Sequence, residues 1–114
     1  MTSPEKMVRM TRLLDLYGAL LTERQRQAME LYYDEDHTLE EISTQAGVTR
    51  QAVHDALRSA ENALEHYEAA LGLMEIRDGL ERLRDEISAQ AGHASRHLAL
   101  IDELRNRLDK RPSP

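Results

Sequence analysis

The chain of 114 residues contains no cysteine, no tryptophan and no phenylalanine, and only three prolines. Without cysteine it can form no disulfide and offer no thiolate to a metal or substrate, which fits a reducing cytoplasm. No apolar run approaches the length that spans a bilayer, and the first residues, MTSPEKMVRM, lack the apolar core of a signal peptide. We therefore expect a cytoplasmic protein without membrane insertion.

The sequence also lacks the patterns on which catalysis or cofactor binding usually depends. It has no glycine-rich phosphate loop, no nucleophile at an informative distance from a base, and no cluster of histidines and carboxylates. His93 and His97 have a spacing that can hold a metal, but no third ligand lies within a turn of them on that face. We interpret them as surface residues and expect no enzyme activity, no cofactor and no metal.

Positive charge is scarce in the first part of the chain. Residues 1–68 hold seven Lys and Arg against thirteen Asp and Glu, so the net charge of −6 lies there. Residues 69–114 are balanced at eight against eight. Duplex binding usually draws much of its affinity from basic side chains that neutralise phosphates. The first part of the chain lacks that supply.

What the middle of the chain does have is a helix-turn-helix pattern. Thr38 and Glu41 form a capping box that begins a short helix. Gly47 supplies the left-handed position that ends it, Val48 fills the corner, and Thr49 caps a longer helix. The expected inner positions of the two helices are Leu39, Ile42, Ala46, Val53, Ala56, Leu57, Ala60 and Leu64. In this arrangement the second helix is offered to a nucleic-acid groove.

The candidate nucleic-acid contacts lie between the core positions of the second helix: Arg50, Gln51, His54 and Arg58. Arg50 or Arg58 could reach phosphate or guanine, and Gln51 could pair with adenine. His54 could add a positive charge near neutral pH. Asp55 would be unfavourable beside phosphate, although an acidic side chain can accept a hydrogen bond from cytosine. The alternative is that these residues are simply the solvated face of a helix.

The N-terminal residues 5–21 form an amphipathic helix with a wide apolar side. So wide an arc exceeds what one contact with a small domain would cover. We therefore expect this helix to pack on the helix-turn-helix unit and also on a second subunit. The predicted dimer interface is Met10, Leu13, Leu14, Tyr17 and Leu21. A second capping box, Thr22 with Gln25, begins a helix that continues to about residue 33.

After the helix-turn-helix pattern the apolar spacing continues to about Met74, and its phase is disturbed around Gly72 and at Gly79. The sequence leaves open whether the helix bends or breaks there. A final amphipathic helix of about 30 residues follows and ends before Pro112. We divide the chain into a helix-turn-helix domain at 1–70, a helical extension at 71–111 and a frayed tail at 112–114.

Two resemblances follow from these residues. The chain resembles region 4 of bacterial sigma factors at 21–26 (LTERQR), 39–42 (LEEI) and 47–49 (GVT). More narrowly, it is similar to the YlxM family of small bacterial helix-turn-helix proteins over about residues 5–75. The matching segments are 9–10 (RM), 13–17 (LLDLY), 20–22 (LLT), 25–26 (QR), 31–33 (LYY), 35–36 (ED), 49–55 (TRQAVHD), 67–68 (YE) and Leu71. Ser43 stands where an alanine is common in such motifs.

The resemblance to the YlxM family implies a role and partners. Members are regarded as regulators in the signal recognition particle pathway, because their genes neighbour those of the particle's GTPase and its receptor. They are all-helical and tend to pair. This likeness implies a cytoplasmic bacterial accessory factor in co-translational targeting, with the particle's RNA or its proteins as partners. It gives no catalytic residue to transfer.

We therefore predict an all-α homodimer in which a sigma-region-4-like helix-turn-helix carries an N-terminal amphipathic helix and long C-terminal helices. Its predicted function is regulation in the signal recognition particle pathway, through binding of nucleic acid (particle RNA or DNA), of the particle's proteins, or of both. One alternative is a DNA-binding transcriptional regulator. The other is a protein-interaction module that does not bind nucleic acid.

Overall fold

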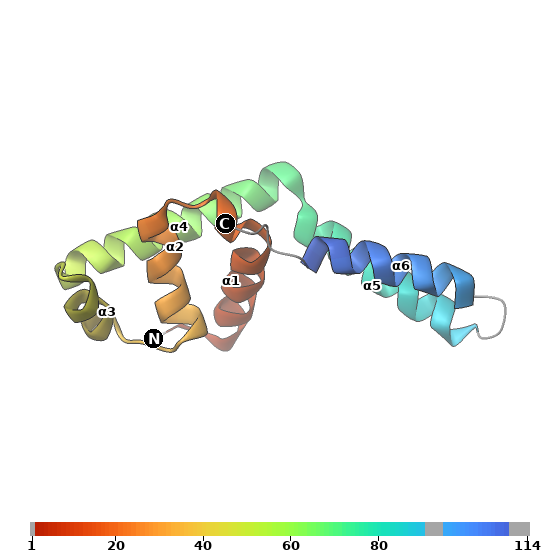
Figure 1. The fold of residues 1–114 in the computed structure, drawn as a ribbon, viewed down its shortest axis with the longest axis horizontal. Helices are drawn as coiled ribbons and strands as arrows, with labels where there is room; N and C mark the ends of the chain where they lie inside the picture. Colours follow the sequence, from red (N-terminus) through yellow and green to blue (C-terminus); the bar gives the residue numbers. More distant parts are fainter. Residues whose placement is uncertain (1, 91–94, 110–114) are drawn as a thin grey trace.

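The computed structural model describes residues 2–90 and 95–109, and the fold class predicted for them, all-α, is confirmed. The described helices are α1 (Pro4–Tyr17), α2 (Glu23–Met29), α3 (Leu39–Ala46), α4 (Arg50–Leu71), α5 (Leu73–Ala89) and α6 (Ser95–Asp109). A 3-10 turn (Gly18–Leu20) follows α1, and a π-helical turn (Glu30–Asp34) extends α2. Helices α1 to α4 form a body, and α5 and α6 form a hairpin that projects from it (Figure 1).

The helices of the body begin where the sequence supplies a capping side chain. Both predicted capping boxes are present: Thr22 with Gln25 begins α2, and Thr38 with Glu41 begins α3. The backbone N–H of Glu41 donates to Thr38 Oγ1 at 3.1 Å, and the N–H of Thr38 donates to Glu41 Oε1 at 3.0 Å. Each box satisfies two backbone donors that helix geometry leaves without partners, which stabilises a helix start by about 1 kcal/mol.

The corner between α3 and α4 has the geometry that the sequence indicates. Gly47 lies in the left-handed region, at φ 68° and ψ 31°, and ends α3. A Cβ atom there would meet nothing within 4 Å, so the backbone conformation and not space favours glycine. Val48 packs against the core, and Thr49 Oγ1 accepts from the N–H of Ala52 at 3.0 Å. The corner thereby fixes the direction in which α4 leaves it.

The hydrophobic core lies inside the body, between α4 and the preceding elements. Helix α4 contributes the buried row that its spacing predicts: Val53, Leu57, Ala60 and Leu64. Ile42 of α3 is also buried, as expected, whereas Ala46, the last residue of α3, is exposed. The core therefore holds α4 along one side and leaves its other sides available.

The predicted dimer interface requires correction. All five of its residues are buried within one chain and none is more than 9% exposed: Met10, Leu13, Leu14, Tyr17 and Leu21. Helix α1, which carries the first four of them, contacts α4, the π-helical turn, α5 and α6, and Leu21 follows the 3-10 turn. The chain thus covers these five residues by itself, and a second subunit is not needed to explain them. Contact with another chain would have to use other residues.

The disturbances in phase around Gly72 and Gly79 have different outcomes. At Gly72 the backbone adopts φ 63° and ψ 28°, so α4 ends and α5 starts directly after it in a new direction (Figure 1). Gly79 lies inside α5, which continues past it without interruption. The helix therefore breaks at Gly72, beside the predicted boundary at residue 70, and stays intact at Gly79.

Tyr17 and Glu68 fix the break at Gly72. The Tyr17 hydroxyl donates to Glu68 Oε1 at 2.7 Å and accepts from the N–H of Leu73 at 3.0 Å. Glu68 also accepts from the N–H groups of Met74 at 3.0 Å and Glu75 at 3.3 Å. Glu68 thereby supplies the cap that a glycine cannot. Burial, and then the bond to Glu68, raise the pKa of Tyr17 to about 12.

The single final helix predicted over roughly 80–108 is wrong, because α5 and α6 are separate helices packed side by side in opposite directions (Figure 1). Three ion pairs join them: Arg77 with Asp109 at 3.1 Å, Arg84 with Asp102 at 2.6 Å, and Arg105 with Glu81 at 2.8 Å. Both helices have the same apolar period, so spacing alone did not reveal two of them. The predicted tail at 112–114 lies outside the described residues.

Candidate nucleic-acid interface

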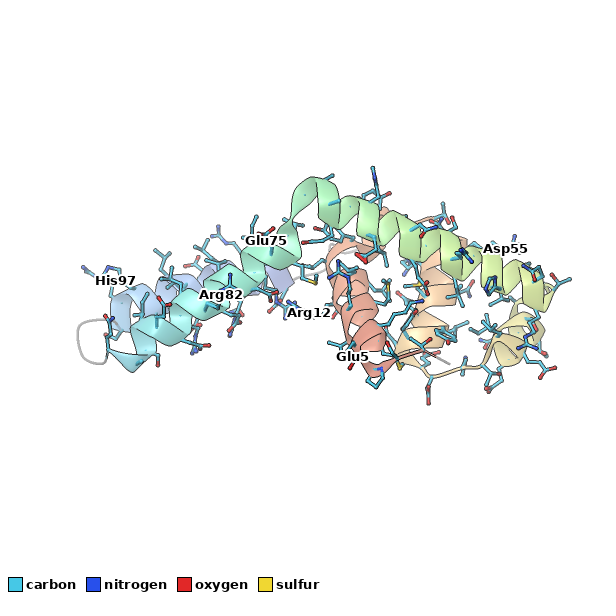
Figure 2. All side chains as sticks on the ribbon, turned by 180° about the vertical axis from the view of Figure 1, so that it is seen from behind. Glu5, Arg12, Asp55, Glu75, Arg82 and His97 are labelled. Atoms are coloured by element: carbon cyan, nitrogen blue, oxygen red, sulfur yellow. The ribbon has the colours of Figure 1, made fainter. Side chains whose placement is uncertain are left out.

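The candidate contact residues lie together on the N-terminal half of α4. They are exposed, and they alternate with the buried row of the same helix: Arg50, Gln51, His54 and Arg58. Because the buried row is fixed in the core, helix geometry directs these four side chains outward. Asp55 lies beside them on the same exposed stretch of α4 (Figure 2). The structure therefore leaves the predicted face of the helix accessible.

Arg50 and Arg58 differ from most other basic residues of residues 2–70. Lys6, Arg9 and Arg26 form ion pairs with Glu61 at 3.0 Å, Glu65 at 2.6 Å and Glu23 at 2.5 Å, respectively, and Arg12 pairs with Asp78. Within the described residues, Arg50 and Arg58 have neither an ion pair nor a hydrogen bond to another side chain, and Arg24 on α2 is the third such residue of this part. The unpaired cations of the body are thus concentrated on α4.

Gln51 and His54 are less free than the two arginines. Gln51 Nε2 donates to Asp55 Oδ1 at 2.9 Å, and His54 Nδ1 lies 3.7 Å from the same oxygen. The side chain of Asp55 is 67% exposed, so solvent screens its charge. Before Gln51 could pair with adenine it would have to leave Asp55. This face of α4 can therefore contact phosphates without rearrangement. Hydrogen bonds from Gln51 to a base would require its side chain to change rotamer.

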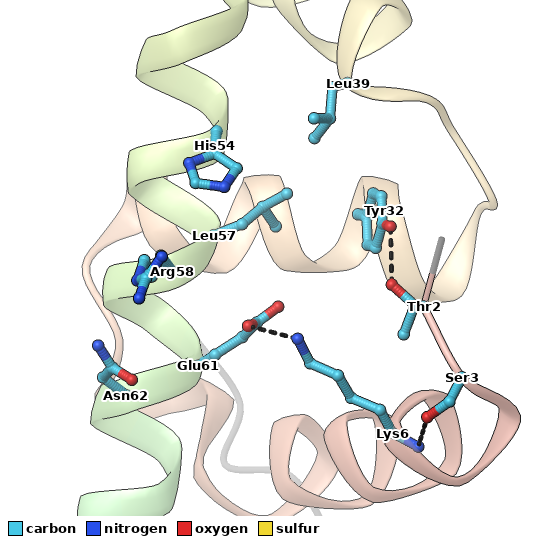
Figure 3. A pocket seen from close by; sticks show the side chains of 10 residues that line it. All are labelled: Thr2, Ser3, Lys6, Tyr32, Leu39, His54, Leu57, Arg58, Glu61 and Asn62. Atoms are coloured by element: carbon cyan, nitrogen blue, oxygen red, sulfur yellow. Dashed lines mark hydrogen bonds and ion pairs between the residues drawn. The ribbon is translucent and has the colours of Figure 1, made fainter.

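Two open clefts adjoin this face of α4. The larger, of about 740 Å³, lies between α4, α3, the π-helical turn and the start of α1 (Figure 3). The smaller, of about 350 Å³, lies beside Arg50 and Gln51. Leu39 and His54 line both clefts, so the two are adjacent. The remaining residues of the larger cleft are Thr2, Ser3, Lys6, Tyr32, Leu57, Arg58, Glu61 and Asn62.

Glu61 neutralises the positive charge of Lys6 in the larger cleft. Its carboxylate accepts from Lys6 Nζ at 3.0 Å and from the Tyr33 hydroxyl at 2.6 Å (Figure 3 shows the pair with Lys6). Burial, and then the bond to Glu61, raise the pKa of Tyr33. Lys6 is neutralised by this pair, which leaves Arg58 as the uncompensated charge of the cleft. Sequence analysis missed Lys6, Tyr32 and Glu61, because they come from three distant segments and carry no local motif.

The described residues form no candidate metal site. Among positions 2–90 and 95–109, no group of three His, Asp or Glu side chains is placed to hold a metal ion. His97 is exposed on α6, and His93 lies outside the described ranges. No described helix is both long and apolar enough to cross a bilayer.

Comparison with known proteins agrees with this geometry. Residues 4–104 match the family described as "Putative helix-turn-helix protein, YlxM / p13 like". The chain is 47% identical to the UPF0122 protein GK1195 of Geobacillus kaustophilus over 88% of this chain and 94% of that relative. It is 43% identical to the UPF0122 protein STH1464 of Symbiobacterium thermophilum, over 90% of this chain and 79% of the relative. That family is one of helix-turn-helix proteins and is not an enzyme family. The chain therefore belongs to the UPF0122 family of YlxM/p13-like helix-turn-helix proteins.

Proposed function

We propose that this protein is a regulatory factor that binds nucleic acid through the exposed face of α4. The observation that carries the proposal is the state of Arg50 and Arg58. Both are exposed and have no ion-pair partner among the described residues, whereas Lys6, Arg9 and Arg12 are neutralised by carboxylates of the same chain. Phosphates attract unpaired cations far more than paired ones, since no internal partner has to be given up.

We extend the proposal to the signal recognition particle pathway, with the particle's RNA as the preferred ligand. The resemblance to YlxM proteins points to that pathway. The charge of the chain supports RNA over long duplex DNA, because residues 1–68 carry an excess of six negative charges and offer a duplex few cations. RNA recognition depends more on shape, unstacked bases and a few phosphate contacts. Two free arginines are compatible with such a mode.

The test is a binding titration of the double variant Arg50→Ala/Arg58→Ala. Its matched control is Arg24→Ala/Arg82→Ala, which removes two unpaired arginines from α2 and α5. We expect the first variant to bind the particle's RNA at least about tenfold more weakly. We also expect the slope of log affinity against log salt to fall by about two. Equal effects of the two variants would contradict the proposal, and tighter binding to random duplex DNA would favour a transcriptional regulator.

We further propose that two chains pair through the hairpin, in place of the α1 interface. Large apolar side chains remain exposed there: Ile76 (52%), Leu83 (46%), Leu100 (56%) and Leu104 (40%). Ile76 and Leu83 are seven residues apart on α5, and Leu100 and Leu104 are four apart on α6, so each pair shares one helix face. Two antiparallel helices with such faces can bury them in a four-helix arrangement with a second copy.

Sedimentation equilibrium of Leu83→Asp/Leu100→Asp tests the pairing. The control Asn106→Asp adds a negative charge at another exposed position of α6. We expect a dimer for the native chain and the control, and a monomer for the double variant. If the native chain is a monomer at all concentrations, the exposed apolar side would instead favour the second candidate function, a protein-interaction module. Retained RNA binding by such a monomer would separate the two roles.

A further inference from the structure

We infer that the two adjacent clefts beside α4 together form a groove for an unpaired nucleic-acid strand. By groove we mean the surface lined by Arg50, His54, Arg58 and Asn62 on α4, and by Leu39 and Tyr32 opposite them. The ligand class is then a single-stranded or looped segment and not a regular duplex. The inference rests on the proposed role of α4 and specifies what α4 binds.

The groove has two chemically different sides. Its α4 side carries Arg50 and Arg58, both without a side-chain partner in the part of the chain that the structure describes. Its opposite side carries the ring of Tyr32 and the side chain of Leu39, both partly buried against the core. Figure 3 shows Tyr32 and Leu39 across the cleft from His54 and Arg58. A cationic side for a backbone, next to an aromatic and aliphatic side for bases, is how single strands are bound.

Polar groups on both sides of the groove add hydrogen-bonding capacity. The amide of Asn62 lines the larger cleft and has no hydrogen-bond partner in the described part of the chain. Thr2 Oγ1 is within 2.9 Å of the Tyr32 hydroxyl, where it holds the end of the ring in place. An amide can both donate to and accept from the edge of an unpaired base. Asn62 is therefore the group best placed to contact such an edge.

Two features disfavour a duplex in the same place. Direct readout needs a helix that projects into a major groove about 12 Å wide. His54 and Arg58 instead border a concave surface that α3 and the start of α1 close on the other side. A duplex would also bring many phosphates toward the acidic body, where Arg24, Arg50 and Arg58 are the only described Lys or Arg side chains without a carboxylate partner. A single strand can enter the groove and place fewer charges near the body.

The experiment measures fluorescence anisotropy with a labelled 12-nucleotide RNA of mixed sequence, alone and annealed to its complement. Native full-length protein is compared with Asn62→Asp and with the control Asn106→Asp. Both substitutions make the same chemical change at an exposed position, one in the groove and one on α6. We expect the single strand to bind roughly tenfold more tightly than the duplex. Asn62→Asp should weaken strand binding roughly fivefold or more, and Asn106→Asp by less than about twofold.

A second variant, Tyr32→Leu, removes the aromatic ring but keeps an apolar side chain of useful size. It should weaken strand binding roughly fivefold or more, with duplex binding unchanged. Because Tyr32 packs against the core, circular dichroism must show that the variant folds. If it does not fold, the comparison of Asn62→Asp with Asn106→Asp still decides the inference.

The outcomes separate this inference from the function on which it rests. Equal or tighter binding of the duplex, lost in Arg50→Ala/Arg58→Ala, would overturn the groove and retain nucleic-acid binding by α4. Equal effects of Asn62→Asp and Asn106→Asp would also overturn the groove. Displacement of the strand by an acidic peptide such as oligoglutamate at similar concentration would show a general anion site and overturn it too. Binding of neither RNA form would remove both proposals.

Discussion

The body and the hairpin are both helical, yet they are held together in different ways. The body has a contiguous core in which Leu13, Met29 and Leu64 are fully buried. In the hairpin only Met74 and Ile101 are buried among the described large apolar residues. Three arginine–carboxylate pairs join its two helices instead. One chain can therefore combine a body that buries its own apolar side chains with a hairpin that leaves most of its large apolar side chains at least partly exposed.

The difference has a simple origin in geometry. Four helices can surround a shared interior, whereas two packed helices bury only the narrow strip between them. Burial stabilises by about 25 cal/mol per Å² of apolar surface, while a partly exposed ion pair contributes about 0 to 1 kcal/mol. The body should therefore supply most of the folding free energy. The hairpin should depend on its contact with α1 and on whatever covers its apolar side.

The largest expected effect comes from truncating equal side chains in the two regions. Leu64 is 0% exposed in the body and Leu83 is 46% exposed in the hairpin. We expect Leu64→Ala to lower the free energy of unfolding by about 3 kcal/mol, since it leaves a cavity. Leu83→Ala should change it by less than about 0.5 kcal/mol in dilute protein. Urea denaturation followed by circular dichroism measures both, and similar losses would refute the contrast.

The second prediction concerns the junction, where Tyr17 connects body and hairpin. Tyr17→Phe removes the hydroxyl that bonds Glu68 and Leu73, and should cost about 1 to 2 kcal/mol near neutral pH. The pKa of Tyr17 is raised from 10.0 to about 12, so the folded state favours the neutral phenol. Its contribution is fully present below pH 10 and is lost as the pH rises toward 12.

The measurement is the unfolding free energy of the native chain and of Tyr17→Phe between pH 7 and the alkaline limit of folding. The difference in unfolding free energy between the two should narrow above pH 10. The native chain then loses the stabilisation from the neutral Tyr17 hydroxyl, which the variant lacks at every pH. Tyr67→Phe is the control, since its hydroxyl makes only a long bond of 3.4 Å to the carbonyl of Leu20. A gap that stays constant or widens with pH would contradict the assignment.

The two glycines beyond the body give the third prediction, with opposite signs. Gly72→Ala should cost about 1 kcal/mol, because φ of 63° strains any residue with a Cβ, although the nearest atom is 4.0 Å away. Gly79→Ala should instead stabilise by about 0.5 to 1 kcal/mol, because Gly79 lies within α5 and has room for a methyl group. Thermal denaturation of both variants would show whether stability falls for Gly72→Ala and rises for Gly79→Ala. A rise in stability for Gly72→Ala would contradict the left-handed helix break at Gly72.

These regions also differ in how much of them could be predicted from sequence. Caps act within three residues, so Thr38, Glu41 and Gly47 revealed the beginning and end of α3. The wide apolar side of α1 was correctly identified, but periodicity does not say what covers it, and the answer was this chain's own α4, α5 and α6. Likewise, an uninterrupted apolar period does not reveal a reversal of direction, and the hairpin was missed for that reason.

The residues of the candidate site also differ in how far the sequence could predict them. The outward direction of Arg50 and Arg58 follows from the buried row of one helix, and the sequence therefore predicted it. Tyr32 and Asn62 face the same cleft only because α4 passes beside the π-helical turn and the start of α1. A juxtaposition of segments 30 residues apart depends on tertiary packing, for which a single sequence offers no local signal.

The smallest expected effect would show whether the hairpin depends on charge as the comparison implies. A double-mutant cycle on Arg84→Ala and Asp102→Ala should give a coupling of about 0.5 kcal/mol in low salt, because the side chains are 33% and 37% exposed. Screening at 1 M salt should remove most of it. Hydrogen exchange would localise the effect: amides of α6 should exchange faster as salt rises, while those around Leu64 in α4 stay protected by the core. If salt accelerates both helices alike, the hairpin is not the charge-dependent region, and its stability has to be attributed to apolar contacts, either with α1 or with another chain.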